Sequence, residues 1–142
     1  MKSRYFQIEE LVSKAVFIKY GETSWQFFDP RLIETIDWIK ENLNRTIVIN
    51  NWLWGRHLEQ RGLRENTSNI VVSKTEHGVI YLSGHVLGMA VDFDVTGITA
   101  QEVREWLYYN RYLLPHPIRL EKNVSWVHLG VDNISNEIIE YF

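Results

Sequence analysis

Two histidines and an aspartate stand in otherwise apolar stretches of the sequence, where a polar side chain needs a physical reason. His85 and Asp92 lie in LSGHVLGMAVDFDV (residues 82–95), and His128 lies in VSWVHLGV (residues 124–131). Side chains on a β-strand alternate between its two faces. If both stretches contain strands, each strand has an apolar face for the core, and Asp92 and His128 point from the opposite faces.

Two imidazoles and a carboxylate form a ligand set that suits Zn²⁺. We expect Asp92 and His128 to face one cleft if their strands are neighbours, and His85 to fold back onto them across a glycine-containing turn. Three protein ligands leave a fourth position for water, whose pKa zinc lowers to about 7. Because a lone His or Asp near a strand is often only a hydrogen-bonded polar residue, spacing alone leaves both interpretations open.

The clearest element that could support such a site is a helix within DPRLIETIDWIKENLN, residues 29–44. Asp29 can cap this helix, Pro30 suits its first turn, and apolar residues recur with helical spacing. Residues 5–21 open with a shorter helical pattern, and residues 45–52 form a β-branched run typical of a buried strand.

The second half of the chain predicts mainly strands. Residues 55–78 are polar and contain three glycines, so we expect an extended loop with little regular structure. A helix over roughly 100–113 begins after Thr99, with a capping-box pattern. Strands are expected at 118–121 and 125–131, joined by a tight turn, and residues 136–142 could pair or pack at an edge. The order predicts an α+β fold with a small antiparallel sheet flanked by helices.

Composition and charge set limits on the function. The 142 residues suit one compact domain over residues 1–142, expected to be a monomer. A net charge of −3 gives no basic footprint for nucleic acid or a membrane surface. The chain has no cysteine, so disulfides, thiolate nucleophiles and cysteine-ligated zinc are excluded. Its first residues lack a signal-peptide pattern and no stretch is long enough to span a membrane, so we expect synthesis in the cytoplasm.

A family resemblance adds to this chemistry. The pattern Ser83-x-His85-x-x-Gly88-x-Ala90-x-Asp92, followed by Trp126-x-His128, resembles the signature of the zinc D-Ala-D-Ala carboxypeptidase family (peptidase family M15). That family includes phage endolysins and the hedgehog signalling domain. The segments YFQIEELV, IVINNW and RGLR also follow the order of phage and prophage members, so the resemblance covers nearly the whole chain.

The resemblance implies a hedgehog-type α+β fold and a role for each matched residue. His85, Asp92 and His128 would bind one Zn²⁺. Arg64 in RGLR, with Arg61 as the second choice, would hold a carboxylate or carbonyl oxygen of the substrate.

Further residues near the motif have supporting roles by the same resemblance. Ser83 would brace the turn or a ligand by hydrogen bonding. Apart from the resemblance, Trp52, Trp54 and Trp126 are candidates for the aromatic lining of a substrate cleft.

The general base departs from the family pattern. Ser125 and Asn123 stand where family members carry an acidic residue or a histidine, respectively. Glu121 is the remaining candidate base, although an exposed glutamate at a strand edge explains it equally well. Gly130 stands where some relatives have an aspartate, and Asp94 could substitute for it or cap the following turn.

Two functional hypotheses follow. The first is a zinc peptidase acting on peptidoglycan stem peptides, at D-Ala-D-Ala or at L-Ala-D-Glu, and released to the cell wall through a hole made by a phage holin. The second is a binding module of the same fold, impaired in catalysis, that belongs to a phage particle or to the cell wall.

Overall fold

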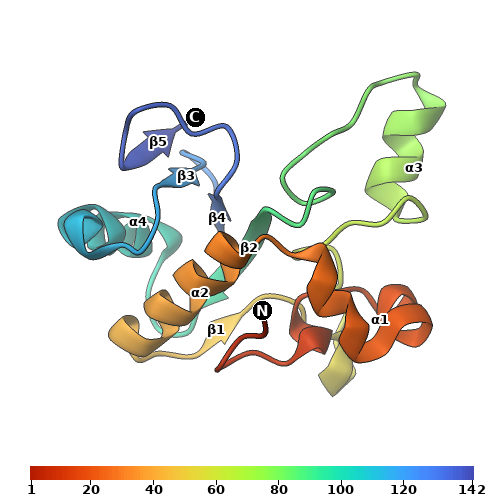
Figure 1. The fold of residues 1–142 in the computed structure, drawn as a ribbon, viewed down its shortest axis with the longest axis horizontal. Coiled ribbons are helices and arrows are strands. Elements are labelled where there is room, and N and C mark those ends of the chain that lie inside the picture. Colours follow the sequence, from red (N-terminus) through yellow and green to blue (C-terminus); the bar gives the residue numbers. More distant parts are fainter.

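A five-stranded mixed sheet, in the order β1-β2-β4-β3-β5, combines one strand from the N-terminal half of the chain with four from the C-terminal half. The computed structural model describes residues 1–142 (Figure 1). The strands are β1 (Ile47–Val48), β2 (Ala90–Val95), β3 (Ile118–Leu120), β4 (Val127–Gly130) and β5 (Ile139–Tyr141). Together with the helices they form an α+β fold, as the sequence predicts.

The chain also has four α-helices: α1 (Lys14–Tyr20), α2 (Pro30–Leu43), α3 (Asn69–Glu76) and α4 (Ala100–Tyr109). Short 3-10 helices occupy Ile8–Glu10, Gly21–Phe27, Trp52–Trp54 and Arg111–Leu113. None of the helices combines the length and the apolar character needed to cross a lipid bilayer.

The α2 helix forms for the reasons its sequence indicates. The Asp29 carboxylate accepts a hydrogen bond from the Arg31 amide at 2.9 Å, and Pro30 occupies the first turn. Its buried residues recur on one face: Leu32, Ile33, Thr35, Ile36, Asp37 and Ile39. This face joins a hydrophobic core of 25 buried residues that also includes the inner face of the sheet.

The expected alternation on the two site strands is confirmed for their apolar faces. Val91 and Phe93 of β2 are 0% and 1% exposed, and Val127 and Leu129 of β4 are 1% and 0% exposed. Because alternate side chains enter the core, the intervening residues lie on the opposite face of the sheet. That face carries the candidate metal centre.

The prediction of a purely antiparallel sheet is wrong at one edge. β5 pairs with β3 in parallel, with Ile118 opposite Ile139. The chain leaves β4, crosses a loop over residues 131–138, and enters the edge of the sheet in the direction of β3. The C-terminal segment therefore pairs at an edge as expected, but the residue pattern did not reveal the direction of pairing.

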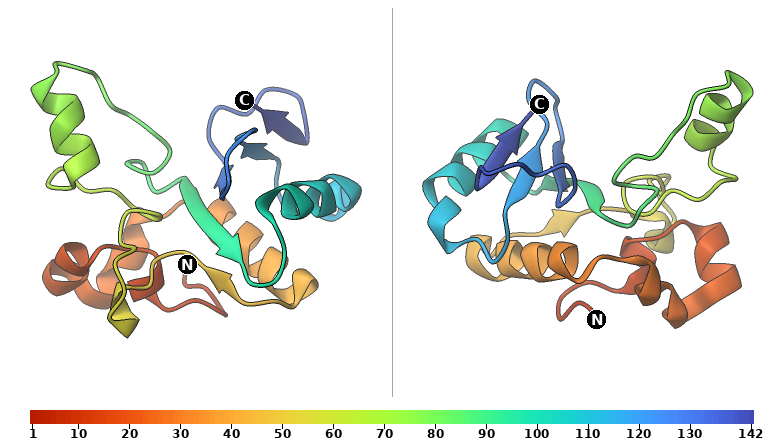
Figure 2. Two further views of the ribbon diagram at one scale, coloured as in Figure 1. Left: turned by 180° about the vertical axis from the view of Figure 1, so that it is seen from behind. Right: turned by 45° about the horizontal axis from the view of Figure 1, so that its top comes forward.

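The prediction of a loop over residues 55–78 is also wrong in part, because α3 lies within it. Ser68 caps this helix, and Val71 is its only buried residue, so the helix shows no apolar stripe. Both views in Figure 2 show α3 standing away from the rest of the chain. Elsewhere, the expected helix over 100–113 is α4 followed by a 3-10 turn, and the strands are shorter than expected.

Candidate metal centre

Strand register brings the predicted residues together. Asp92 of β2 lies directly opposite His128 of β4, and Ala90 lies opposite Gly130. In an antiparallel pair, side chains of opposite residues share a face of the sheet. On the other side of β4, the Glu121 amide donates to the His128 carbonyl at 3.4 Å, so Glu121 adjoins the same row. The row Asp92, His128 and Glu121 thus crosses three neighbouring strand segments.

Three ligand atoms converge above this row. His128 Nδ1 lies 2.8 Å from Asp92 Oδ1, and His85 Nε2 lies 3.2 Å from Asp92 Oδ2. The two imidazole nitrogens, His85 Nε2 and His128 Nδ1, are 3.3 Å apart. Ligands about 2.0–2.1 Å from a tetrahedral Zn²⁺ are separated by about 3.3–3.4 Å, which is close to this spacing.

The turn before β2 sets the orientation of His85. His85 Nδ1 lies 2.9 Å from the Gly62 carbonyl, to which it can donate only as N–H. In a neutral ring this leaves an unprotonated Nε2 facing Asp92 and His128, as in metal-binding histidines held by a carbonyl. Gly62 packs so closely that a Cβ would lie 2.0 Å from the Leu11 carbonyl oxygen. The carbonyl that orients His85 is therefore fixed by close backbone packing.

Ser83 and Gly88 shape the same turn. The Ser83 carbonyl accepts hydrogen bonds from the Val86 and Leu87 amides at 3.0 and 3.1 Å, and its hydroxyl accepts weakly from Val86 at 3.4 Å. Gly88 has a φ of +67°, and a Cβ there would lie 1.8 Å from the Phe27 carbonyl oxygen. Both the positive φ and the close approach explain why this motif position holds glycine.

Asp92 is a buried carboxylate, only 7% exposed, in an electropositive setting. Burial alone raises its pKa, but hydrogen bonds and charge interactions with His128 and His85 outweigh burial and hold the pKa below the ordinary value. The carboxylate is therefore anionic at neutral pH. An anion facing two imidazole nitrogens is a ligand set that fits a divalent cation when both nitrogens are unprotonated.

Arg64 lines this centre, but most of its contacts are within the protein, and its expected role in holding a substrate oxygen stays a prediction. Its Nε donates to the Gln60 carbonyl at 2.9 Å and its Nη1 to the Tyr81 hydroxyl at 2.7 Å. Its Nη2 donates to Asp92 Oδ2 at 3.3 Å. Arg64 thereby supports the Asp92 carboxylate. Gln60 and Tyr81 lie in loops outside any motif, so no sequence pattern indicates them.

The ligands open onto a hollow of ≈ 360 Å³. Predicted residues that line it besides the ligands are Arg64, Ser83, Glu121 and Trp126. Glu121 is half-buried, and its carboxylate has no hydrogen-bond partner within the chain. The structure thus places Glu121 beside the candidate ligands rather than at a remote strand edge.

Other residues named from the sequence lie outside this hollow. Asp94 is exposed and pairs with Arg61 at 2.7 Å, so neither residue joins the centre. Trp52 donates its indole N–H to the Val12 carbonyl at 2.7 Å, and Trp54 is 58% exposed. Their expected place in an aromatic cleft was wrong, because both lie on the 3-10 helix at residues 52–54 and not among the lining residues. Of the three tryptophans, only Trp126 lines the hollow.

Six of the lining residues were not predicted, and three of them, Arg119, Asp132 and Phe142, come from parts of the chain outside the motif. The Phe142 ring meets the His128 ring edge-on, with centroids 5.5 Å apart. Asp132 Oδ1 is buried and has no hydrogen-bond partner. These residues come from β3, from the 131–138 loop and from the end of β5, and only tertiary pairing unites them.

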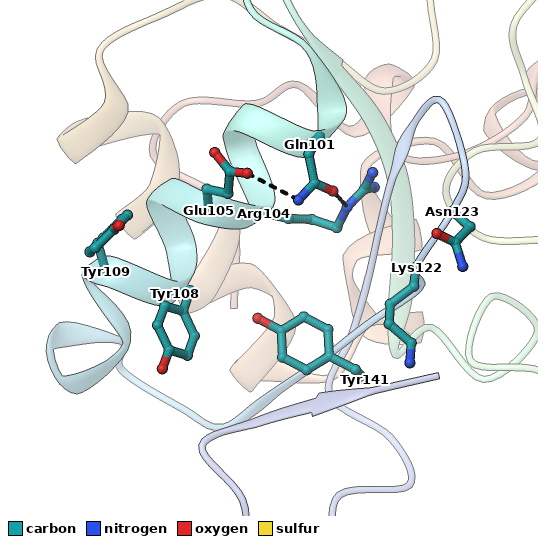
Figure 3. A pocket seen from close by; sticks show the side chains of 8 residues that line it. All are labelled: Gln101, Arg104, Glu105, Tyr108, Tyr109, Lys122, Asn123 and Tyr141. Carbon is teal, nitrogen blue, oxygen red and sulfur yellow. Dashed lines mark hydrogen bonds between the residues drawn. The ribbon is translucent and has the colours of Figure 1, made fainter.

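A separate hollow of ≈ 440 Å³ lies between α4 and β5 (Figure 3). It is lined by Tyr108, Tyr109 and Tyr141 together with polar side chains of α4 and of the turn after β3. None of the three candidate ligands lines it, so it does not form part of the metal centre.

Comparisons of this chain with models of protein families, with curated proteins and with solved structures gave no match. The geometry of the centre and the motif residues themselves are therefore what indicates a function.

Proposed function

We propose that this protein is a zinc-dependent peptidase that hydrolyses a peptide bond in the stem peptides of peptidoglycan. The observation that carries the proposal is the convergence of His85 Nε2, Asp92 and His128 Nδ1, whose ligand atoms all lie within 4.8 Å of one another. Further support comes from the unpaired carboxylate of Glu121 in the same hollow. The motif resemblance supplies the substrate class.

Each residue has a distinct task in this proposal. His85, Asp92 and His128 would hold one Zn²⁺, which supplies Lewis acidity that polarises a carbonyl and makes water more acidic. Glu121 takes the proton of the attacking water on its carboxylate and then delivers it to the nitrogen of the leaving group. Arg64 keeps Asp92 in place through its 3.3 Å hydrogen bond. The Glu121 amide donates to the His128 carbonyl, so the pairing of the two strands sets the position of the base relative to this ligand.

The hydrolysis that this proposal describes is balanced without any further reactant. The C–N bond of the scissile amide breaks, and a C–O bond to the water oxygen forms. One water proton goes to the leaving amine by way of Glu121, and the new carboxylic acid releases the other proton to solvent at neutral pH. The two products are a peptide carboxylate and an amine.

We expect this chain to act as a phage or prophage lysis protein, which reaches the cell wall through an opening made by a holin. In this proposal the protein acts as a monomer and has no nucleic-acid or membrane partner. A net charge of −3 supports the absence of a nucleic-acid partner.

One alternative has a specific observation in its favour. Ser125 and Asn123, which stand at the two usual base positions of the resembled family, line other hollows and not the metal centre. A module of the same fold that holds zinc but no longer hydrolyses peptides would fit these substitutions. Such a module would serve a phage particle or a cell-wall-associated protein.

Glu121→Gln tests the peptidase against this alternative. With zinc-loaded protein and muropeptides analysed by mass spectrometry, we expect turnover to fall by about 100-fold or more, because the variant loses a general base. Zinc content should stay at the wild-type value. The matched control is Glu137→Gln, an exposed glutamate outside the hollow, which should leave both quantities unchanged. Zinc-loaded wild type that cleaves no stem-peptide bond would refute the peptidase and favour the binding module.

A further inference from the structure

The Arg119 side chain is the unassigned cationic group of the metal-centre hollow. Arg119 lies on β3 between Ile118 and Leu120, which are both 0% exposed in the core. Its own side chain therefore points from the opposite face, where its register partner is Gly130. Arg119 thus stands on the same face of the sheet as Asp92, His128 and Glu121.

The N–H donors of the Arg119 guanidinium have no acceptor within the chain. It makes no hydrogen bond within the chain, although its side chain is only 25% exposed. Its nearest carboxylate is Asp132, whose Oδ2 lies 3.9 Å from Nη1, beyond hydrogen-bond distance. That oxygen already accepts from Asn133 Nδ2 at 3.1 Å. The N–H groups of Arg119 therefore have no hydrogen-bond acceptor within the chain and are available to water or to a ligand.

Phe142 holds this guanidinium in place. Arg119 Cζ lies 3.9 Å from the centroid of the Phe142 ring, a cation–π distance. Backbone hydrogen bonds fix Phe142 in turn: its amide donates to the Leu120 carbonyl at 3.1 Å, and its carbonyl accepts from Lys122 at 2.8 Å. A guanidinium supported through its face presents its N–H groups at its edge, the geometry suited to a carboxylate.

Arg64 differs from Arg119 in this respect. Three of its N–H groups already donate to Gln60, Tyr81 and Asp92. Arg64 is thus used within the protein, where it forms an ion pair with Asp92. Arg119 is the second cation among the lining residues. The hollow is lined by two arginines and the three carboxylates Asp92, Glu121 and Asp132, so bound Zn²⁺ would make its formal charge positive.

We propose that Arg119, supported by Phe142, is a carboxylate-binding subsite that receives the free α-carboxylate of the leaving D-residue. This inference rests on the proposed peptidase function. Both candidate bonds precede a D-residue with a free α-carboxylate, either terminal D-Ala or D-Glu, which continues the stem through its side-chain carboxyl. Such a carboxylate lies within one residue length, about 3.6 Å, of the scissile carbonyl. Its receptor must therefore line the same hollow as the metal ligands, as Arg119 does.

The test measures binding of product-side fragments to zinc-loaded protein by NMR titration, independently of turnover. D-alanine is compared with D-alaninamide, and γ-D-glutamyl-L-lysine with its α-amide, D-isoglutaminyl-L-lysine. In wild type we expect the acid of one pair to bind about tenfold or more tightly than its amide, because a charge-assisted hydrogen-bonded pair is lost in the amide. The pair that shows the preference identifies the source of the carboxylate.

Variants assign the preference to a residue. Arg119→Gln should bring the acid-to-amide ratio close to one, and Arg119→Lys should retain part of it because the charge remains. Arg111→Gln is the matched control, since Arg111 also stacks on tyrosine rings, 4.1 Å from that of Tyr108, but lies outside the hollow. A full preference in Arg119→Gln, its loss in Arg111→Gln, or no preference in wild type would each overturn the subsite.

The outcomes separate this inference from the proposed function. Zinc binding with cleavage, but an unchanged acid preference in Arg119→Gln, rejects the subsite and leaves the peptidase intact. A preference that depends on Arg119 in a protein that cleaves no stem peptide supports the subsite and rejects the peptidase. Zinc content and the unfolding midpoint are measured for every variant, so a variant that has lost its fold is recognised, and Arg119→Lys then carries the test.

Discussion

Asp92 contacts more of the candidate centre than any other single side chain. Its carboxylate meets His128 at 2.8 Å, His85 at 3.2 Å and Arg64 at 3.3 Å. Its amide donates to the Arg61 carbonyl at 2.7 Å, which joins β2 to the 60–64 segment. One residue therefore links the ligands to the backbone that surrounds them.

Replacing Asp92 by Asn should remove zinc from the protein. The amide is neutral and is a poor ligand for zinc beside two imidazoles, so we expect the zinc content after dialysis to fall from about one ion per chain to near zero. Elemental analysis measures this content. The control is Asp94→Asn on the same strand and face, where the carboxylate is exposed and pairs with Arg61. Equal zinc in both variants would contradict the assignment of Asp92 as a ligand.

Sequence reasoning succeeded for residues governed by strand alternation. The period of two correctly separated Val91 and Phe93 from Asp92, and the observed register placed His128 opposite Asp92. It could not identify Arg119 or Phe142, since their meeting depends on which strand occupies the sheet edge. No local pattern records that choice.

Among the elements, the turn between Ser83 and β2 has the strictest backbone requirement. Gly88 combines a positive φ with contact against the backbone of Phe27, which precedes α2. The Gly88 carbonyl also accepts from the Asp29 amide at 3.0 Å, so the turn and the start of α2 are joined. The helix and the motif turn thus depend on each other.

Gly88→Ala should destabilise the protein strongly, whereas Gly78→Ala should cost about 1–2 kcal/mol, the contribution of the positive φ alone. Both glycines have a φ of +67°, but a Cβ at Gly78 meets nothing within 4 Å. The left-handed conformation alone costs about 1–2 kcal/mol, and the clash at Gly88 should bring the loss in the free energy of unfolding to the order of 4 kcal/mol. Urea denaturation measures both. Similar losses in the two variants would show that the contact with Phe27 is unimportant.

The sequence predicts a helix or strand more readily when that element buries more apolar surface. α2 buries one full face and was identified with its cap, while α3 buries only Val71 and was taken for loop. The direction of β5 was similarly out of reach, since parallel and antiparallel edge strands present the same short pattern. Elements that tertiary contacts alone select leave little signal in the sequence.

At the scale of the whole molecule, the candidate ligands join separate parts of the chain. His85 belongs to the turn held by the 60–64 segment, Asp92 to β2 and His128 to β4. A cation bound by all three would bind the folded chain and not the unfolded one. Metal binding should therefore be visible as stability.

Zinc should raise the melting temperature of wild type and leave that of His85→Ala unchanged. At a free zinc concentration of about 100 times Kd the gain is about 2.7 kcal/mol, or about 5–10 °C for a chain of this size. Differential scanning calorimetry with zinc or with EDTA measures it. His57→Ala, which removes an exposed histidine, should keep the full shift. A shift of equal size in both variants would indicate zinc binding elsewhere on the surface.

The Arg64 amide donates a hydrogen bond to the His85 carbonyl at 3.1 Å. This bond joins the two ends of an excursion of the chain, the segment that contains α3. Residues 66–80 therefore leave the scaffold and return to it at nearly one point, beside the reactive groups. A loop segment whose two ends are held together can change in length or sequence without a change in the rest of the fold. An insertion grafted there would be joined to the chain beside His85, so this excursion is the place where a new segment would disturb the sheet and the core least.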